Sequence, residues 1–415
     1  MKILHITPHL GGGVGKVLSE LVKRSKTVLS DIEYNIEHTI VCLDKPEKQQ
    51  FINIINSVGN KVIIEPTENE LVELIKNSDI VQLEFWNHPI LFKYICTIEI
   101  PKIRLLVWYH NNGLYNPIMP KKLLLEAHMV LYTSSCSYQN VSNTGYVFSS
   151  GGFKEFPKQK NKNYKSISVG YVGGTNFSKL HPDYAEYINE VDIPNFKVKI
   201  IGDLYNKEIL EKQSTKFEFK GFIPNLVDEL KSINILAYLL NPYHYGTTEN
   251  SLLQAMSMGV VPIVLDNKCE IQIVIDNYTG FIIHNKKEFA EKIKFLANNS
   301  NKLEELGNNA SDYVRNKFTI ENTEFELKYN YYRLMNKEKR KIDFKKIFGN
   351  NPEEWFLSCQ TFKQNFKNDG TIDLYNVDKY YKYLLTEKSN GSILYFNKYF
   401  PENEVLKRWT NSIKV

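Results

Sequence analysis

The residues best suited to chemistry gather in the run 243–264, where polar residues and a glycine precede an apolar, helix-like stretch. Glu249 offers a carboxylate and Gln254 an amide, and both types of group bind the hydroxyls of a small molecule. An ordinary helix ahead of a buried strand would explain Leu252 but not the whole run. We therefore interpret this run as a ligand-binding segment.

The start of this helix is a predicted anion site. Thr247 or Thr248 is expected to cap it, because a hydroxyl can accept a hydrogen bond from the first turn. The backbone N–H groups from about Asn250 and Ser251 onward then face outward, at the positive end of the helix dipole. A phosphate is the ligand that this geometry favours.

A second glycine-containing run, 168–179, places Gly173 and Gly174 at the end of a predicted strand and Lys179 a few residues later. Close approach of the backbone followed by one cation suits a diphosphate, whose leaving-group charge must be neutralised. A lysine after a strand is usually only solvated, so the specificity of this prediction rests on the run 243–264.

The first predicted strand is followed by glycines that include Gly12 and Gly13. They could bring backbone N–H groups to an anion. The loop is not a Walker A motif, because Val17 stands where a hydroxyl would hold magnesium, and Lys16 occupies the third glycine position of the dinucleotide fingerprint. A tight turn without a ligand explains this loop as well.

Further polar residues follow two later predicted strands of the first half. His110 ends one of them, where exposure toward a cleft is more common than burial. Glu84, Trp86 and His88 end the preceding strand and could hold an acceptor, with the indole on a sugar face and the other two bonding hydroxyls. Packing within a turn is an equally good explanation for these three.

Two series of strands and helices must position these residues. Short β-branched runs alternate with helical periodicity, a pattern typical of βαβ units around a parallel sheet. The predicted strands are 2–7, 37–43, 61–64, 80–84, 104–109 and 129–133 in the first series, and 166–172, 197–201, 217–219, 233–239, 260–265 and 280–283 in the second. Ligands of such sheets lie beyond the carboxyl ends of the strands, so we predict a site in a cleft between two facing domains.

Composition limits the class of protein. The chain has 415 residues, 42% apolar and 24% charged, which suggests two or three globular domains. No apolar run is long enough to span a membrane, and five scattered cysteines indicate neither disulfides nor a zinc cluster, so we expect a cytoplasmic protein. Lysines bunch at 158–165 and 336–346. A solvated surface explains these clusters better than nucleic-acid binding does. Peripheral contact with the inner face of a membrane remains open, and so does homo-oligomerisation.

The run 243–264 resembles the donor-binding stretch of retaining GT-B glycosyltransferases of the glycosyl transferases group 1, or family 4, type, which includes bacterial capsule and lipopolysaccharide transferases. In that family a Glu, seven residues and a second Glu open the helix. Residues 252–256 match the family's L-L-E-A-M, so the resemblance implies that Gln254 binds the ribose hydroxyls. The first Glu falls on Gly246, and Glu249 lies close enough to supply that carboxylate.

The resemblance covers about residues 1–335. Gly173 and Lys179 match the family's V-G-R-L-x-x-x-K, with Lys179 as the phosphate lysine and Gly174 in place of the arginine. His110 stands where many members keep a histidine near the donor sugar. Residues 270–283 are similar to a further family motif.

The resemblance implies an α/β, GT-B fold of two facing Rossmann-like domains. We predict an N-terminal acceptor-side domain over 1–150, a linker over 151–165, a nucleotide-sugar domain over 166–320 and a helical C-terminal extension over 321–415. The implied activity is transfer of a hexosyl or N-acetylhexosaminyl group from a nucleotide diphosphate sugar, with UDP favoured, to a glycan, lipid-linked or protein acceptor. Retention of configuration follows from the family.

No D-x-D sequence occurs, so no metal or other cofactor is expected. The predicted catalytic residues are His110, Lys179 and Glu249. Two alternatives come from other classes of function. One is a catalytically silent GT-B protein that binds a glycan or supports a partner transferase, which the changes at Gly246 and Gly174 favour. The other is a nucleotide-sugar epimerase, for which the sequence offers no acid and base pair.

Overall fold

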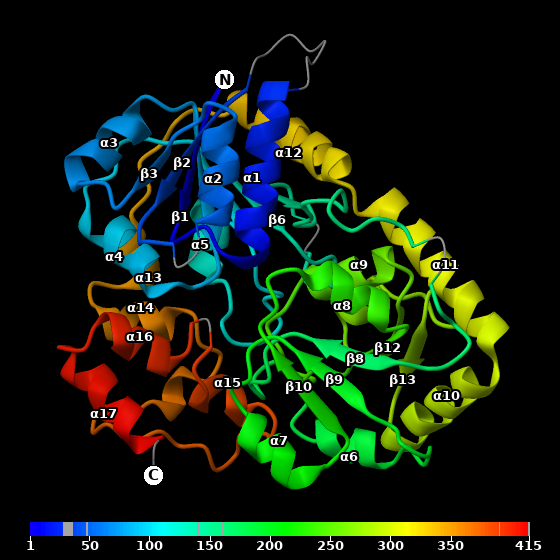
Figure 1. Ribbon diagram of the computed structural model, residues 1–415. Helices are drawn as coiled ribbons and strands as arrows, with labels where there is room; N and C mark the ends of the chain where they lie inside the picture. Colours follow the sequence, from blue (N-terminus) through cyan, green and yellow to red (C-terminus); the bar gives the residue numbers. More distant parts are fainter. Residues whose placement is uncertain (28–35, 47–48, 139–140, 160–161, 390, 414–415) are drawn as a thin grey trace. The chain divides into compact units, whose positions relative to one another are not determined.

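The structure is a computed structural model that describes residues 1–27, 36–46, 49–138, 141–159, 162–389 and 391–413. Residues 160–161 of the predicted linker lie outside this part of the chain. The chain divides into two compact units (Figure 1). Unit 1 comprises Met1–Gly151, Ile320–Val377 and Lys388–Val415, and unit 2 comprises Gly152–Thr319 and Asp378–Glu387.

Unit 1 is built on a parallel sheet with the strand order β3-β2-β1-β4-β5-β6-β7. The strands are β1 (Lys2–Thr7), β2 (Glu37–Cys42), β3 (Val62–Ile64), β4 (Ile80–Phe85), β5 (Leu105–Tyr109), β6 (Met129–Tyr132) and β7 (Thr144–Tyr146). The order reverses between β1 and β4, and doubly wound sheets bind ligands beyond the carboxyl ends of the strands at such a point. The short edge strand β7, which contains a glycine, was not predicted.

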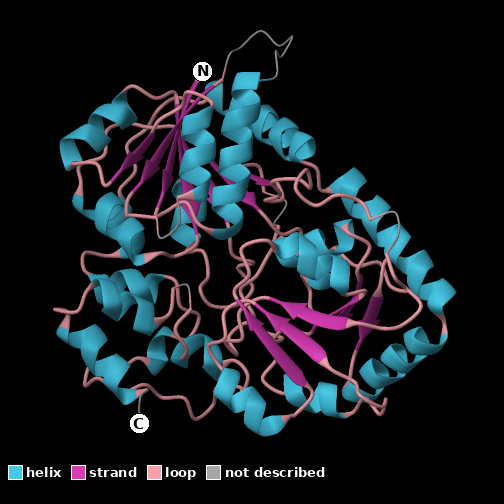
Figure 2. Cartoon of the chain, in the orientation of Figure 1, coloured by secondary structure: helices cyan, strands magenta, loops and turns pink. Residues whose placement is uncertain are grey.

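Helices cover both faces of this sheet (Figure 2). The helices of unit 1 are α1 (Gly12–Thr27), α2 (Gln50–Ser57), α3 (Glu68–Lys76), α4 (Pro89–Thr97), α5 (Lys121–Glu126), α12 (Ile320–Met335), α13 (Phe344–Phe348), α14 (Pro352–Ser358), α16 (Ile393–Tyr399) and α17 (Glu404–Ser412). Every residue of β4 and β5 is buried, as expected for central strands of a sheet that is covered on both sides. The polar Gln82 and Glu84 of β4 are therefore buried too.

Helix α12 belongs to the core of unit 1. Leu327, Tyr331 and Leu334 are buried in the same cluster as Ile3 and Trp108 of the sheet. The region from 321 onward is helical, as predicted, but it does not form a separate body. Its first helix has an apolar face that completes the core of the N-terminal sheet.

Unit 2 repeats the architecture with the parallel strand order β10-β9-β8-β11-β12-β13. Its strands are β8 (Val169–Val172), β9 (Val198–Ile201), β10 (Phe217–Gly221), β11 (Ile235–Tyr238), β12 (Val261–Leu265) and β13 (Phe281–Ile283). Its helices are α6 (Tyr184–Asn189), α7 (Lys207–Gln213), α8 (Leu226–Ser232), α9 (Asn250–Ser257), α10 (Lys286–Asn298), α11 (Ser300–Lys317) and α15 (Lys382–Thr386). The order reverses between β8 and β11, so both predicted runs, 168–179 and 243–264, follow strands at the reversal.

Helix α9 ends at a residue that only glycine suits. Gly259 has φ +75°, and its N–H donates to the carbonyl of Met256, so the helix closes in a left-handed turn directly before β12. This turn links the helix of the predicted ligand site to a fully buried strand. Among the described residues, none of the helices combines the length and the apolar character that crossing a membrane requires.

Candidate active site

The loop after β8 presents two glycines at the carboxyl end of the sheet of unit 2. Gly173 and Gly174 are half-buried, whereas Thr175 is fully buried. A Cβ on Gly202, at the end of the neighbouring strand, would lie 2.2 Å from the carbonyl oxygen of Gly173, so the two loops pack backbone against backbone. Gly173 and Gly174 thus stay partly exposed while the loop around them is fixed.

Lys179 and Glu249 form an ion pair in unit 2, with 3.0 Å between Lys179 Nζ and Glu249 Oε2. The Tyr238 hydroxyl donates to the same oxygen at 2.5 Å. Burial opposes both charges, but each partner outweighs it, so the pKa of Lys179 is raised and the pKa of Glu249 is lowered. The structure thus brings two of the predicted catalytic residues together as a charged pair.

Glu249 is also the N-cap residue of α9, but its side chain makes no capping hydrogen bond. The predicted cap by Thr247 or Thr248 is not found at the N-cap position, which Glu249 occupies because the helix starts at Asn250. The carboxylate of Glu249 instead turns back toward Gly246. A Cβ on Gly246 would lie 1.7 Å from Glu249 Oε1.

A second buried pair lies beside the first. His244 Nε2 is 3.0 Å from Glu270 Oε2, and the N–H of Gly246 donates to His244 Nδ1 at 3.0 Å. Burial opposes charge on the ring, yet Glu270 raises the pKa of His244. Ligand atoms of His244, Glu249 and Glu270 lie within 4.8 Å of one another, a spacing that could hold a metal ion.

The hydrogen bonds disfavour a metal at this cluster. Because His244 Nδ1 accepts from the N–H of Gly246, the ring proton lies on Nε2, so both ring nitrogens already take part in hydrogen bonds. The ammonium group of Lys179 already compensates the carboxylate of Glu249. Glu270 Oε1, in contrast, is buried without a hydrogen-bond partner in the described part of the chain.

The remaining predicted donor residues lie on the first turns of α9. Asn250, Ser251 and Gln254 are half-buried, so their side chains reach the surface. Leu252 is fully buried and can contribute only its backbone. Gln254 lies one turn beyond Asn250, on the same side of the helix, which suits a ligand that extends from the helix start.

In unit 1, Glu84 lies at the centre of a buried hydrogen-bond network. Its Oε2 accepts from His110 Nε2 at 2.7 Å, and its Oε1 accepts from His5 Nδ1 at 3.0 Å and from Gln82 Nε2 at 2.8 Å. Burial alone would raise the pKa of Glu84, but its hydrogen bonds and charge interactions with His110 and His5 outweigh burial, so the pKa is lowered. The Tyr331 hydroxyl of α12 donates to Gln82 at 2.7 Å and extends the network.

Glu84 is fully buried, so direct contact with an acceptor does not fit its geometry. The same holds for His88, which caps α4 by accepting from the N–H of Ile90 and contacts the Tyr395 hydroxyl at 2.8 Å. Burial lowers the pKa of His88 to about 2. We therefore revise both predictions: Glu84 and His88 position other groups.

Trp86 is 5% exposed and lies edge-on to His9 and His110, with ring centroids 5.5 and 6.1 Å away. These side chains follow β1, β4 and β5, which are adjacent in the sheet. Gly12 and Gly13 open α1 after β1, at the same edge of unit 1. The predicted site residues thus fall into two groups, one at the carboxyl ends of each sheet.

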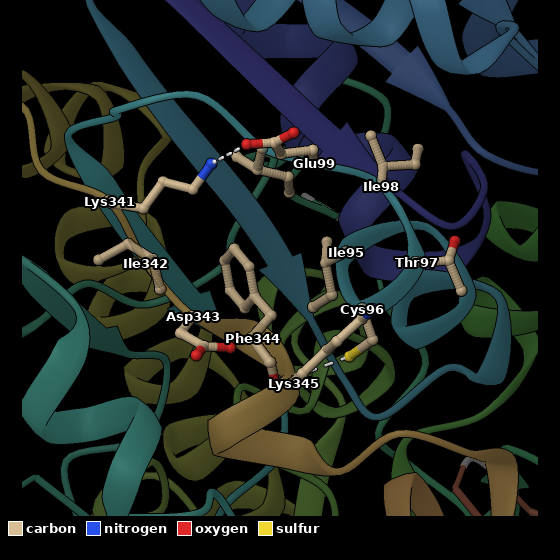
Figure 3. A pocket seen from close by; sticks show the side chains of 11 residues that line it. Ile95, Cys96, Thr97, Ile98, Glu99, Lys341, Ile342, Asp343, Phe344 and Lys345 are labelled. Atoms are coloured by element: carbon tan, nitrogen blue, oxygen red, sulfur yellow. Dashed lines mark hydrogen bonds and ion pairs between the residues drawn. The ribbon is translucent and has the colours of Figure 1, made fainter.

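A cavity of 290 Å³ lies elsewhere in unit 1 (Figure 3). It is lined by 95–100, from the end of α4 onward, and by 341–345, and the ion pair of Lys341 with Glu99 at 3.1 Å borders it. Because α4 starts where β4 ends and runs back, its last turn lies at the amino ends of the strands. This cavity is therefore separate from the site residues of unit 1.

Sequence reasoning missed four residues of the site in unit 2. Tyr238 donates directly to Glu249, His244 and Glu270 pair with each other beside it, and Tyr245 lies close enough to Lys179 to influence its pKa. Tyr238 ends a buried strand, and a single tyrosine at that position gives no sequence signal of a binding site. His244 and Glu270 both lie in runs that the family motifs cover, so their pairing could have been proposed from those motifs.

Comparison with known proteins shows which family and which relatives this chain is similar to. Residues 152–313 match the family model for Glycosyl transferases group 1. The capsular polysaccharide biosynthesis glycosyltransferase CapM of Staphylococcus aureus is 24% identical over 211 residues, which cover 46% of this chain and 55% of CapM. The uncharacterized glycosyltransferase MJ1069 of Methanocaldococcus jannaschii is 29% identical over 191 residues, 43% of this chain and 48% of that protein. The chain spans about half the length of these curated relatives.

Solved structures share the fold. Anabaena Alr3699/HepE in complex with UDP superposes with a TM-score of 0.64 at 13% identity, covering 80% of this chain and 100% of that one. TarM superposes with a TM-score of 0.61 at 14% identity, covering 81% and 99%. Both are GT-B proteins in architecture, and the predicted GT-B class of two Rossmann-like sheets with a helical C-terminal region is confirmed.

Proposed function

We propose that this chain is a glycosyltransferase that takes its sugar from a nucleotide diphosphate sugar, because residues 152–313 match the family model for Glycosyl transferases group 1. The observation that carries the proposal is the pair of Lys179 and Glu249 at the start of α9, beside the glycines that follow β8. This arrangement supplies a cation, a helix N-terminus and exposed backbone for the diphosphate.

UDP is the nucleotide that we propose. The structural neighbours Alr3699/HepE and TarM support it, because crystal structures of Alr3699/HepE with UDP and UDP-glucose and of a TarM variant with UDP exist. Gln254 would bind the ribose hydroxyls, and Gly173 and Gly174 would approach the phosphates. The acceptor would be a glycan, a lipid-linked glycan or a protein, and CapM, which acts in capsular polysaccharide biosynthesis, favours a glycan.

In the proposed reaction the acceptor hydroxyl attacks the anomeric carbon as the bond to the diphosphate breaks. Lys179 and the N–H groups at the start of α9 stabilise the negative charge on the leaving group, which amounts to several kcal/mol at the transition state. The acceptor attacks from the same face that the diphosphate leaves, and the leaving phosphate takes its proton, so that configuration is retained and no metal is required. Glu249 supplies the carboxylate that the family motif carries at position 246.

The unit 1 residues would serve the sugar and the acceptor. His110 Nε2 is committed to Glu84, so Nδ1 is the ring nitrogen that could bind a hydroxyl of the sugar. Trp86 lies behind this ring and fixes its plane. The chain would act on the cytoplasmic side of a membrane or in the cytoplasm, where nucleotide sugars are made.

The experiment is a calorimetric titration of the purified chain with UDP, GDP, ADP, CMP and their sugars. UDP should bind, and Lys179→Ala should weaken binding about 10- to 100-fold, because charge-assisted hydrogen bonds to the diphosphate are lost. Lys212→Ala, an exposed lysine on α7, is the matched control and should bind normally. Lys179→Ala with Glu249→Gln should restore stability but not binding, since the unpaired buried carboxylate is removed.

A GT-B protein without activity is the second candidate, and Gly174 in place of a family arginine favours it. Failure of every nucleotide to bind the folded chain would select this candidate. Binding of UDP without turnover of any UDP-sugar, even by hydrolysis, would also select it.

A further inference from the structure

Residues 378–387, here called the C-terminal strap, pack on unit 2, although the residues on either side of them belong to unit 1. The strap contains α15 and lies against the loops that follow β8 and β11. These loops carry the residues to which we assign donor binding. The strap itself lies outside residues 152–313, the part of the chain that matches the family model.

The contacts of Glu387 are buried and specific. Its Oε2 accepts from the N–H of Ser178 at 2.8 Å, and its Oε1 accepts from Asn206 Nδ2 at 2.8 Å. The N–H of Asn206 in turn donates to Thr175 Oγ1 at 3.1 Å. Glu387 thus ties the residue next to Lys179 to the loop after β9.

Aromatic residues of the strap hold the same loops from other sides. Tyr383 contacts Phe177, with 5.3 Å between the ring centroids, and Tyr380 contacts His181 at 5.1 Å. The loop after β11 is held as well, because Asn241 Nδ2 donates to the carbonyl oxygen of Tyr380 at 3.0 Å and to that of Phe177 at 2.7 Å. The strap therefore joins both halves of the donor site.

The position of the negatively charged Glu387 beside the proposed diphosphate site needs an explanation. A carboxylate near a diphosphate site repels the ligand, so a role in attracting the donor would favour a neutral or basic residue. One oxygen of Glu387 instead accepts from the backbone N–H of Ser178, and the other accepts from the side-chain amide of Asn206 in the loop after β9. This is the chemistry of a group that fixes backbone, because a loop N–H that is buried without an acceptor would be costly.

We propose that the C-terminal strap is part of the donor site and that Glu387 is a positioning residue, which holds the loop 173–179 so that Lys179 meets the diphosphate. This inference rests on the proposed function, because it assigns a role in donor binding to a segment that only supports the binding residues. It predicts that the strap sets the affinity for the donor without touching it.

The test compares UDP affinity in Glu387→Ala, Glu387→Gln and wild type by calorimetry. The alanine variant should weaken binding at least about tenfold, the equivalent of one or two hydrogen bonds. The glutamine variant should stay within about threefold of wild type, because its oxygen can accept from Ser178 while the Asn206 amide turns to accept from its NH₂ group. Unchanged or tighter binding in Glu387→Ala, the result that loss of a negative charge alone predicts, would overturn the inference.

A matched control separates positioning from general stability. Asn285→Ala removes the N-cap of α10 in the same unit, away from the donor loops. It should lower the melting temperature without changing UDP affinity. If Glu387→Ala does not fold, Asn206→Ala takes its place and should weaken UDP binding by a smaller factor of about three; wild-type affinity in that variant would count against the strap.

Hydrogen exchange in the absence of nucleotide separates failure of this inference from failure of the proposed function. Glu387→Ala should exchange the amides of 175–180 at least about tenfold faster than wild type, with the amides of α10 unchanged. If wild type binds no nucleotide, the proposed function fails. Faster exchange in Glu387→Ala would still show that the strap fixes the loop. Equal exchange in the two proteins would refute the strap's role whether or not UDP binds.

Discussion

The carboxylate of Glu249 occupies the place where a side chain on Gly246 would begin. A Cβ on Gly246 would lie 1.7 Å from Glu249 Oε1, far inside any real contact distance. The family motif carries its first glutamate at the position of Gly246. In this chain Gly246 leaves room for the carboxylate of Glu249, so the two residues together replace that glutamate. This explains how a departure from the motif is compatible with a working site.

The first prediction concerns this exchange. Gly246→Ala should displace Glu249 from Lys179 and reduce turnover about 100-fold, with a loss of about 1–3 kcal/mol in stability from overpacking. Initial rates with a UDP-sugar and chemical denaturation measure the two effects. Gly59→Ala, at φ +77° in unit 1, is a control for backbone strain and should cost stability but not activity.

The double variant Gly246→Glu with Glu249→Gly sharpens this prediction. It moves the carboxylate back to the position of the family motif and clears the space that the side chain at 246 needs. We expect its rate of turnover to be at least about tenfold higher than that of Gly246→Ala. A wild-type rate in Gly246→Ala would show that the position of the Glu249 carboxylate does not matter.

The second prediction concerns Glu84 and His110 in unit 1. Glu84→Gln keeps the shape of the side chain but can no longer accept from His5, Gln82 and His110 together, so the ring of His110 loses its fixed orientation. The value of kcat should fall about 10- to 100-fold, whereas UDP affinity should not change.

Steady-state kinetics of Glu84→Gln, His110→Asn and the double variant measure this coupling. The two losses should not add, because both variants disrupt the same interaction. Glu37→Gln, an exposed glutamate at the start of β2, serves as the control. Additive losses, or weaker binding of UDP in Glu84→Gln, would contradict the assignment of Glu84 as a positioning residue.

The third prediction concerns acid stability. Burial lowers the pKa of His181 from 6.5 to about 4, and its Nδ1 accepts from the N–H of Asp183. The unfolded chain therefore binds more protons than the folded chain between pH 6.5 and 4, so the stability contribution is full above pH 6.5 and falls as the pH drops. The loss is at most about 3 kcal/mol by pH 4.

His181→Asn should reduce this acid sensitivity, because the amide oxygen can accept from Asp183 but does not titrate. Urea denaturation of both proteins at pH 7, 5.5 and 4.5 measures the difference. The two curves of stability against pH should converge as the pH falls. Parallel curves would show that His181 is not buried as a neutral ring.

The fourth prediction concerns metal removal. UDP affinity should be the same with EDTA and with about 5 mM MgCl₂, since Lys179 supplies the charge that a metal would otherwise supply, and His244 Nε2 carries a proton. Calorimetry under both conditions measures this. A tenfold or larger gain in affinity with Mg²⁺, lost in Glu270→Gln, would instead place a metal at the buried cluster.

Much of the fold followed from the sequence because β-branched runs and glycine turns recur at regular intervals. The central strands β4 and β5 were predicted almost to the residue, because both are rich in apolar residues, and β5 is continuously apolar as expected for a strand that is buried on both faces. The edge strand β7 was missed, because three residues that include a glycine carry no periodic signal. The role of α12 in the core of unit 1 could not be predicted, because periodicity shows that a helix has an apolar face but not which sheet it covers.

The candidate site followed only in part. The motif led to Lys179, which the structure pairs with Glu249, and the proximity of Glu249 to position 246 was proposed from the sequence. The role of Gln254 stays a prediction. The predicted threonine is not found at the N-cap position, because Glu249 occupies it and pairs with a lysine 70 residues earlier. Glu84 and His88 were assigned to an acceptor because sequence shows that a polar residue ends a strand but not whether its atoms are already bonded.

The path of the strap has a consequence for biosynthesis. Ser178 and its buried acceptor Glu387 are 209 residues apart, and α12 joins the core of unit 1 only after all of 152–319 has been made. A ribosome releases the chain from its N-terminus, and domains usually fold as they emerge. Neither unit of this chain can complete its folding in that order, because each unit contains a segment that is synthesised after part of the other. The nascent chain carries an incomplete N-terminal core until α12 is made, and a donor loop without its buried acceptor until residue 387 is made, so newly made protein should depend on chaperones more than its size alone suggests.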